Sequence, residues 1–234
     1  MTNKTEFLKY YKMLYNKLLN EEFVIDKSGV KLVELIAPRF ELDPAEEYVD
    51  IGIRSSNSKY VLQETDWYMS KELNIDRVNS VKIWQDCADN NNEINSNYGY
   101  LVFGRGNFNQ FDNCLKTLLN HNESRQAIII YNRPSIHYEA NSFNCKDFIC
   151  TMYQQFLIRN GKLETITSMR SNDCIFGTMN DIPWFHLVIK KLHIELLKNN
   201  IDITLGKHIF IPNSWHCYER HFKILKGVAE QNES

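Results

Sequence analysis

The chain has 234 residues, of which 43% are hydrophobic and 24% are charged, and these are ordinary values for a globular protein. Its formal net charge of −2 argues against a general binder of nucleic acids or anionic membranes, because such proteins carry a broad basic surface. No stretch approaches the ~18 uncharged apolar residues of a membrane span, and the charged N-terminal segment lacks the apolar core of a signal peptide. We therefore expect a cytoplasmic protein whose partners include neither a membrane nor a nucleic acid.

The spacing of cysteines and histidines gives no sign of a metal site. The six cysteines are scattered and include no CxxC pair, so reduced thiols are expected rather than a disulfide framework. The seven histidines match no common zinc spacing. The sequence therefore predicts a protein without a bound metal ion.

Apolar periodicity and turn residues predict the elements of an α/β fold. In chain order we expect a helix up to about residue 20, a β-rich stretch at 23–42, a helix at 59–73, a polar loop at 88–97 and a helix at 108–119. There follow a buried strand at 127–134, a β-hairpin at 147–171, a helix at 181–198, a strand at 208–212 and a last helix from 214 onward. Without a linker, repeat or composition break, residues 1–234 are expected to form one domain, with a large mixed β-sheet packed against several helices.

The hairpin at 147–171 is the most informative local feature. Two β-prone runs flank Asn160-Gly161, the preferred pair for a two-residue type I′ turn. With regular pairing from this turn, Cys150 lies across from Ser171. Arg170 then falls on the other face, unless a β-bulge redirects it. Local sequence alone thus predicts a thiol beside a hydroxyl, with an arginine nearby.

A single cysteine in a strand is usually a small core residue, and that alternative stays open for Cys150. Its predicted neighbours are unusually polar, however, since Asp147, Thr151, Ser171 and Arg170 all lie close to it. A cationic neighbour favours the thiolate, which is the nucleophilic form. Cys150 is therefore the candidate nucleophile.

The run MRSNDCIFGTMND at 169–181 resembles the signature RSxDxxLGxPFN of the thymidylate synthases. Further blocks that follow this family's order are DKSG at 26–29, ETDW at 64–67, IWQDCAD at 83–89, NYG at 97–99, SR at 124–125, the strand with Cys150, and HCY at 216–218. The resemblance covers roughly residues 20–225. Within the superfamily, the segments DKSGVK, EINSNYG, IIIYNRPS, DFICT, MRSND and HCYERHF are most similar to the phage deoxycytidylate hydroxymethylases.

The resemblance implies a chemistry and a role for each matching residue. Cys150 would add to C6 of the pyrimidine, so that C5 takes a one-carbon unit from the co-substrate 5,10-methylenetetrahydrofolate, and water would complete a hydroxymethyl group. Glu64 would act as general acid and base, and Tyr98 would line the proton-transfer site. Asp181 would read the base and assist catalysis.

The remaining implied roles concern binding. The phosphate would be held by Lys27, Arg125, Arg170 and Ser171, the deoxyribose by His216 and Tyr218, and the folate by Trp84 and Asp173. Family membership also implies a symmetric homodimer in which a sheet face of each subunit packs against its twin. The active sites would be shared, because Arg125 would come from the other subunit.

The sequence departs from the thymidylate synthase pattern at several positions. Gln126 stands in place of a second phosphate-binding arginine, and Lys27 replaces another arginine. Thr151 follows the nucleophile where histidine is usual, and Cys87 replaces a folate-side tryptophan. Asp181 replaces the asparagine that reads uracil, which favours cytosine as the base.

We therefore expect an enzyme that converts dCMP into 5-hydroxymethyl-dCMP, a product suited to phage DNA modification. The same chemistry on dUMP or CMP, and thymidylate synthesis itself, remain as alternatives. A non-enzymatic alternative is an inactive relative that binds nucleotides or RNA. For Asp181 the structural alternative is a cap at the start of the helix expected at 181–198.

Overall fold

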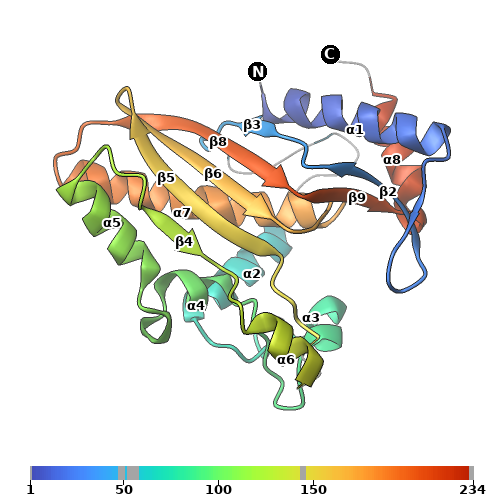
Figure 1. Ribbon diagram of the computed structural model, residues 1–234, viewed down its shortest axis with the longest axis horizontal. Coiled ribbons are helices and arrows are strands. Elements are labelled where there is room, and N and C mark those ends of the chain that lie inside the picture. The colour runs from blue at the N-terminus through green and yellow to red at the C-terminus, as the bar shows by residue number, and fades with distance from the viewer. Residues whose placement is uncertain (1, 47–50, 52–57, 143–145, 232–234) are drawn as a thin grey trace.

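The computed structural model describes residues 2–46, 51, 58–142 and 146–231 (Figure 1). Its α-helices are α1 (Asn3–Leu19), α2 (Ser58–Ser70), α3 (Lys82–Cys87), α4 (Tyr98–Phe103), α5 (Gln110–Asn120), α6 (Ile136–Ser142), α7 (Gly177–Lys198) and α8 (Phe222–Ala229). Its strands are β1 (Val24–Ile25), β2 (Lys31–Ile36), β3 (Phe40–Leu42), β4 (Ile128–Ile130), β5 (Thr151–Arg159), β6 (Lys162–Met169), β7 (Asn172–Asp173), β8 (Thr204–Pro212) and β9 (Ser214–Tyr218). Two short 3₁₀ helices are η1 (Arg105–Asn107) and η2 (Glu219–His221).

The strands form two sheets where the sequence predicted one large sheet. The larger has the order β3-β8-β6-β5-β4, and the smaller has the order β1-β2-β9-β7. Both are mixed, because β6 pairs with β8 and β7 pairs with β9 in parallel while the other pairs are antiparallel. The sheets meet at Asn213, the residue between β8 and β9, whose N–H donates to the Met169 carbonyl oxygen at 2.7 Å and whose own carbonyl accepts from Ala37. The α/β class is confirmed, with the sheet divided at this junction.

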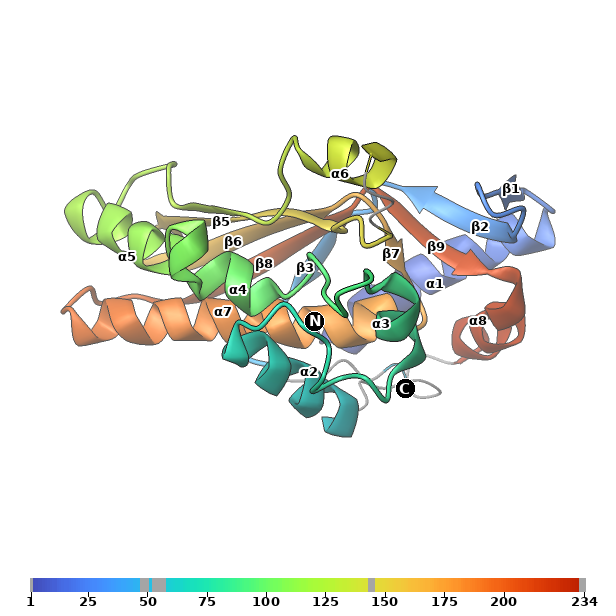
Figure 2. The ribbon, with the colours of Figure 1, turned by 90° about the horizontal axis from the view of Figure 1, so that it is seen from below.

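One face of the five-stranded sheet packs against α7, which runs along it (Figure 2). Strand side chains alternate between faces, so those that point toward α7, such as Phe156 and Phe210, are fully buried. The opposite face carries polar side chains such as Gln155 and Glu164. It also carries apolar side chains that are half-buried or exposed: Ile128, Ile130, Tyr153, Leu157, Ile166, Ile209 and Ile211. We call this set the outer sheet face.

The predicted helices are confirmed for α1, α2 and α5, with ends that differ from the expected ones by three residues or fewer. Two other predictions are corrected. Helix α7 begins at Gly177, four residues earlier than expected, and the segment from residue 214 starts as strand β9. Antiparallel pairing with β2 along its whole length makes Ser214–Tyr218 a strand, and the last helix begins at Phe222. Long-range pairing, which is invisible in a local window, decides this segment.

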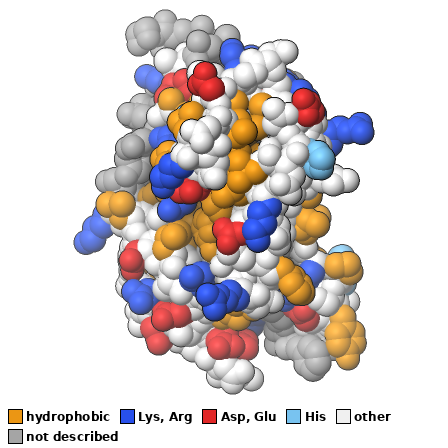
Figure 3. All heavy atoms as spheres, turned by 90° about the vertical axis from the view of Figure 1, so that its left-hand side faces the viewer, with side chains coloured by type: hydrophobic (Ala, Val, Ile, Leu, Met, Phe, Trp, Pro, Cys, Tyr) orange, Lys and Arg blue, Asp and Glu red, His pale blue; other side chains and the backbone are white. Residues whose placement is uncertain are grey.

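A hollow of about 400 Å³ lies between α5, α7 and the end of α2. Figure 3 views the end of the molecule where α5 and the C-terminal half of α7 lie, and it shows a band of hydrophobic side chains between charged ones. The hollow is lined by Met69, Lys71, Phe103, Asn109, Phe111, Asp112, Leu115, Lys191 and Glu195. None of these is a predicted site residue. In the part of the chain that the structure describes, none of the helices has the length and apolar character to cross a membrane.

Two histidines are buried between α7 and the five-stranded sheet. The rings of His186 and His208 lie 5.2 Å apart in an edge-to-face arrangement. His186 Nδ1 lies 2.9 Å from the Glu46 carbonyl oxygen, and His208 Nε2 lies 2.8 Å from Thr167 Oγ1. Burial lowers the pKa of His186 to about 4 and lowers that of His208 well below its usual value. Both rings are therefore neutral in the folded protein at neutral pH.

This neutrality predicts a pH-dependent contribution to stability. Below pH ~6.5 the unfolded chain protonates both of these histidines. The folded protein keeps each ring neutral down to its lowered pKa, so in that range each ring costs up to about 1.4 kcal/mol of stability per pH unit as the pH falls. Above pH ~6.5 both rings are neutral in the folded and in the unfolded state, so they impose no such cost on stability. Because buried carboxyl groups titrate in the same range, the test is a comparison. In urea unfolding, His186→Leu should lose less stability than the unsubstituted protein between pH 7 and pH 5, and the exposed His137→Gln should lose the same amount. Equal slopes for His186→Leu and the unsubstituted protein would contradict the assignment.

Candidate active site

Cys150 directly precedes β5, at the point where the β5–β6 hairpin changes register. The turn at Asn160-Gly161 is confirmed, with φ angles of 50° and 71°. Pairing is regular from there up to Tyr153, which lies opposite Ser168, but Thr151 then lies opposite Met169. One residue of β5, Met152, is thus additional, and the ladder contains a β-bulge.

The bulge overturns the predicted pairing of Cys150 with Ser171. The backbone N–H of Arg170 donates to the Cys150 carbonyl oxygen at 2.8 Å, so Arg170 is the residue beside the thiol. Arg170 Nη2 lies 3.4 Å from Cys150 Sγ. The predicted proximity of thiol and arginine is therefore present, and it is achieved by the bulge that redirects Arg170.

The Arg170 guanidinium is held in place by the segment that leads to the nucleophile. Nη2 donates to the Phe148 carbonyl oxygen at 2.6 Å and Nε donates to that of Ile149 at 3.2 Å. The guanidinium also lies 4.9 Å from the centre of the Phe148 ring. Burial raises the pKa of Cys150 to about 11, and the positive charge of Arg170 opposes this rise. The thiol is therefore protonated at rest, with the cation that favours its thiolate already in contact.

A buried carboxylate anchors the same segment. Asp147 accepts hydrogen bonds from the Ser96 backbone N–H at 2.6 Å and from its hydroxyl at 2.7 Å. Next to it, Arg133 forms an ion pair with Glu139 at 2.6 Å and donates to Asn95 Oδ1 at 2.7 Å. These contacts join the loop before α4 to the residues before Cys150.

Tyr98 is the first residue of α4 and is buried beside the nucleophile strand. Thr151 Oγ1 donates to its phenol oxygen at 2.8 Å, and its ring stacks on Tyr68 with the centroids 5.2 Å apart. Burial and the nearby groups Asp181 and Cys150 raise the pKa of Tyr98, so it remains a neutral phenol. Thr151, one of the departures from the family pattern, thus donates a hydrogen bond to Tyr98, the residue predicted to line the proton-transfer site.

Glu64 lies on α2 with a phenol as its hydrogen-bond donor. Tyr60, one helical turn earlier, donates its hydroxyl to Glu64 Oε1 at 2.6 Å, and Trp84 Nε1 donates to the Tyr60 oxygen at 3.1 Å. Burial, reinforced by Asp181, raises the pKa of Glu64 to about 8. Glu64 can therefore donate or accept a proton near neutral pH. Sequence analysis missed Tyr60, although the i,i+4 spacing on a predicted helix is a usable signal.

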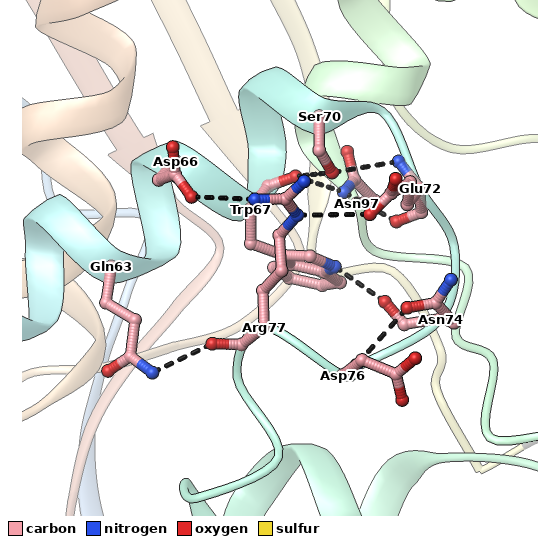
Figure 4. Close-up of polar contacts among 9 residues, drawn as sticks. All are labelled: Gln63, Asp66, Trp67, Ser70, Glu72, Asn74, Asp76, Arg77 and Asn97. Atoms are coloured by element: carbon pink, nitrogen blue, oxygen red, sulfur yellow. Dashed lines mark hydrogen bonds and ion pairs between the residues drawn. The ribbon is translucent and has the colours of Figure 1, made fainter.

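Helix α2 is positioned by polar contacts at its C-terminal end (Figure 4). Trp67 Nε1 donates to the Asn74 carbonyl oxygen at 2.7 Å, and Asn97 Nδ2 donates to the carbonyl oxygens of Trp67 and Glu72 at 2.9 and 2.8 Å. The side chain of Asn97 also caps α4 by accepting from the Tyr100 N–H. One asparagine thus links the helix of Glu64 to the helix of Tyr98.

Asp181 is the fifth residue of α7, whose N-cap position is Phe176. The alternative that it only caps this helix is therefore wrong. Asn172 Nδ2 donates to Asp181 Oδ2 at 2.8 Å. Burial, with a further contribution from Asp173, raises the pKa of Asp181 to about 7. Asn172 also escaped sequence analysis, because its partner is nine residues away and no local pattern links the two.

The four-stranded sheet supplies the predicted sugar-binding residues. His216 and Tyr218 are two apart on β9 and their rings lie 4.8 Å apart. Burial raises the pKa of Tyr218, and the negative charge of Asp173 raises it further. Asp173 lies beside His216 in the parallel β7–β9 ladder. Burial lowers the pKa of His216, and the negative charge of Asp173 opposes this shift only in part.

The predicted phosphate ligands divide into two groups. Arg170 and the half-buried Ser171 lie at the site, and the exposed Lys27 lies in the turn between β1 and β2, the hairpin that pairs with β9. Arg125 is exposed and lies elsewhere, since its carbonyl accepts from Gln155 Nε2 at 2.8 Å. Gln155 is five residues along β5 from Cys150, or roughly 16 Å of extended chain. The same chain does not bring Arg125 to its own thiol.

The fold and the arrangement around Cys150 agree with the comparisons with known proteins. The sequence profile described as thymidylate synthase matches residues 8–234, and the chain belongs to the thymidylate synthase family. It is 38% identical over 214 residues to the deoxycytidylate 5-hydroxymethyltransferase of Enterobacteria phage T4, which covers 89% of this chain and 84% of the relative. The proteins of the same name from phages T2 and T6 have the same identity and coverage. Among the described residues, no group of three His, Cys, Asp or Glu side chains is arranged to hold a metal ion.

The contact between Arg170 and the thiol predicts the reactivity of the unliganded protein. Arg170→Ala should slow alkylation of Cys150 by iodoacetamide at pH 8 by roughly threefold to tenfold, because a cation that favours the thiolate is lost. Mass spectrometry of the Cys150 peptide measures this rate separately from the other cysteines. Arg159→Ala, on the same hairpin, is the matched control and should react like the unsubstituted protein. An unchanged or faster rate in Arg170→Ala would show that the guanidinium does not activate the thiol.

Proposed function

We propose that this chain is a deoxycytidylate 5-hydroxymethyltransferase that converts dCMP, 5,10-methylenetetrahydrofolate and water into 5-hydroxymethyl-dCMP and tetrahydrofolate. The observation that carries the proposal is Asp181, a carboxyl group with a pKa of about 7 at the site of Cys150. In its neutral form this group offers one donor and one acceptor, the pattern that the N3 and amino group of cytosine require. The names of the phage relatives agree with this substrate.

Cys150 begins the reaction by adding to C6 of the cytosine ring, which forms a C–S bond and leaves negative charge at C5. The thiol must first lose its proton, and Arg170 at 3.4 Å stabilises the resulting thiolate. A proton on N3, held by Asp181, draws electrons from C6 and assists the attack. C5 would then bond to the one-carbon unit and lose its proton to a base. Breakage of the bond between that unit and the folate nitrogen would release tetrahydrofolate and leave an exocyclic methylene on C5, with Cys150 still bonded to C6.

The residues on the folate side fit a pterin ring. Trp84 is half-buried, Phe176 is 42% exposed, and both present flat apolar surface near the site. Asp173 offers a carboxylate for the pterin nitrogens, with one oxygen held by the backbone N–H groups of Ile175 and Phe176 at 2.8 and 3.1 Å. When bound, the folate supplies a one-carbon unit at the oxidation level of formaldehyde.

Glu64 handles the protons of the last steps. An exocyclic methylene on C5 takes up water, whose oxygen bonds to the methylene carbon while one proton leaves to a base. Glu64, with a pKa of about 8 and Tyr60 as its donor at 2.6 Å, can accept that proton and return it. Electrons then return to the ring, and the C–S bond to Cys150 breaks. Water addition in place of hydride transfer yields the hydroxymethyl product.

The active species is a homodimer that buries the outer sheet face. Seven apolar side chains on that face remain half-buried or exposed in one chain, and a large unpaired apolar surface favours association. Arg125 cannot reach Cys150 of its own chain, so the site would take Arg125 of the partner subunit as a phosphate ligand. A phosphate dianion requires several such donors.

A product assay tests the proposed reaction. With methylenetetrahydrofolate, the protein should convert dCMP into a product heavier by one CH₂O group, as measured by mass spectrometry. CMP and dUMP should react poorly, and addition of a methyl group would instead indicate a thymidylate synthase. Cys150→Ser should lose turnover by at least ~10³-fold, because a serine hydroxyl is a far weaker nucleophile near neutral pH than a thiolate. It should still bind dCMP, whose phosphate contacts lie elsewhere.

Subunit mixing tests the shared site. Cys150→Ser and Arg125→Ala subunits should each be poorly active alone, and a mixture should regain up to about a quarter of the activity, because half of the dimers are hybrids with one intact site. Lys116→Ala, in place of Arg125→Ala, is the control and should be active without a partner. No recovery, when hybrid dimers are demonstrated by native mass spectrometry, would count against a site shared through Arg125.

A further inference from the structure

Three buried side chains form a hydrogen-bonded series that ends on Asp181. Trp215 Nε1 donates to Thr178 Oγ1 at 2.9 Å, and the Thr178 hydroxyl donates to Asn172 Oδ1. Asn172 Nδ2 then donates to Asp181 Oδ2 at 2.8 Å. Trp215 and Thr178 are 0% exposed and Asn172 is 3% exposed. Because these side chains are buried, bulk water does not compete for their polar atoms. The orientation of each side chain therefore depends on the hydrogen bond from the one before it.

The direction of the series is set by its first member. An indole N–H can only donate, so the Thr178 oxygen accepts from Trp215 and its single hydrogen is available for Asn172. The hydroxyl donates to the carbonyl oxygen of the Asn172 amide, and its other acceptor, the Asp173 carbonyl oxygen, lies farther away at 3.5 Å. The amide nitrogen then faces Asp181, with Met169 Sδ as a second neighbour at 3.4 Å. In this arrangement Asp181 Oδ2 accepts a hydrogen bond from Asn172, whose amide is supported by Thr178 and Trp215.

This orientation decides where a neutral Asp181 carries its proton. Oδ2 already accepts from Asn172, so the proton resides on Oδ1 and Oδ2 keeps one further lone pair. A donor at Oδ1 and an acceptor at Oδ2 match the N3 acceptor and the amino donor of cytosine. Uracil presents a donor at N3 and an acceptor at O4, and it would meet donor against donor and acceptor against acceptor.

A carboxylic acid without this constraint could move its proton to the other oxygen and accept either base. We propose that Asn172 is a positioning residue that makes Asp181 selective for cytosine, by holding the Asp181 proton on Oδ1, and that Thr178 and Trp215 fix the Asn172 amide. The inference rests on the proposed function, in which Asp181 reads the base of dCMP. Asn172 and Thr178 both occupy open positions of the signature RSxDxxLGxPFN, so the motif itself assigns them no role.

The test is the ratio of kcat/KM for dCMP to that for dUMP, measured with one preparation of each variant. The inactive fraction of a preparation cancels in this ratio, so partial misfolding does not mimic the effect. Asn172→Ala should lower the ratio by about tenfold or more, since the mismatched base no longer meets a fixed donor and acceptor. Thr178→Val, which keeps the shape but removes the hydroxyl, should lower it by a smaller factor. Thr178→Ser keeps the hydroxyl and should retain the ratio.

A pH profile gives a second readout that packing alone would not change. The hydrogen bond from Asn172 lowers the pKa of Asp181, against the effect of burial. If neutral Asp181 binds cytosine, the alkaline limb of kcat/KM for dCMP follows its deprotonation. Loss of the donor in Asn172→Ala should move this limb to higher pH, and Thr178→Ser should leave it in place.

Asp181→Asn separates this proposal from the proposed function. If Asp181→Asn lowers the dCMP:dUMP ratio while Asn172→Ala and Thr178→Val leave it unchanged within twofold, the Asn172 proposal is wrong and the assignment of Asp181 stands. If Asp181→Asn also leaves the ratio unchanged, the base reader is misassigned and both fail. Should Asn172→Ala not fold, the comparison of Thr178→Val with Thr178→Ser decides the outcome. A dCMP:dUMP ratio that is lowered in Thr178→Val and retained in Thr178→Ser supports the proposal.

Discussion

One additional residue in β5 determines the geometry of the whole site. Up to Tyr153 the β5–β6 hairpin is regular, and a continuous ladder would have left Arg170 on the face away from the thiol. Met152 breaks the ladder, and its carbonyl oxygen instead accepts from the Tyr131 N–H at 3.0 Å on the other side. The bulge is thus held from both neighbouring strands, and it brings a guanidinium to 3.4 Å from Cys150 Sγ. The proposed chemistry depends on this contact, because the burial that excludes water from the thiol also opposes its ionisation.

Burial keeps two carboxyl groups of the predicted site protonatable, and each accepts a hydrogen bond from a neighbouring side chain. Glu64 is held by Tyr60 and Asp181 is held by Asn172. Their pKa values of about 8 and about 7 lie near physiological pH, where a group can both give and take a proton. Each donor is itself held by a further side-chain hydrogen bond. The Tyr60 oxygen accepts from Trp84 Nε1, and the Asn172 amide oxygen accepts from the Thr178 hydroxyl.

The site lies where the two sheets meet, and each layer contributes one type of function. The five-stranded sheet supplies Cys150 and leads into Arg170, while β9 of the four-stranded sheet supplies His216 and Tyr218. Helix α2 brings Glu64 from the far side of the core, where Asn97 couples it to α4. Catalysis requires reacting groups to be held in precise positions, and this junction links the elements that carry the predicted site residues. The outer sheet face is the surface through which we propose that two subunits associate.

Much of this protein follows from short stretches of sequence. The Asn160-Gly161 turn, the helices α1, α2 and α5 and the motif around Arg170 depend on neighbouring residues, and their physical causes (turn dihedral angles, apolar periodicity and motif spacing) act over a few residues. The bulge at Met152, the strand at Ser214–Tyr218 and the division into two sheets depend on partners far along the chain, and a local pattern carries no information about them. The same holds for Asn172, whose amide is oriented by an indole 43 residues away through Thr178. Sequence determined which groups are available for the chemistry, and tertiary burial decided their protonation and orientation, because desolvation and long-range hydrogen bonds exist only once the chain has packed.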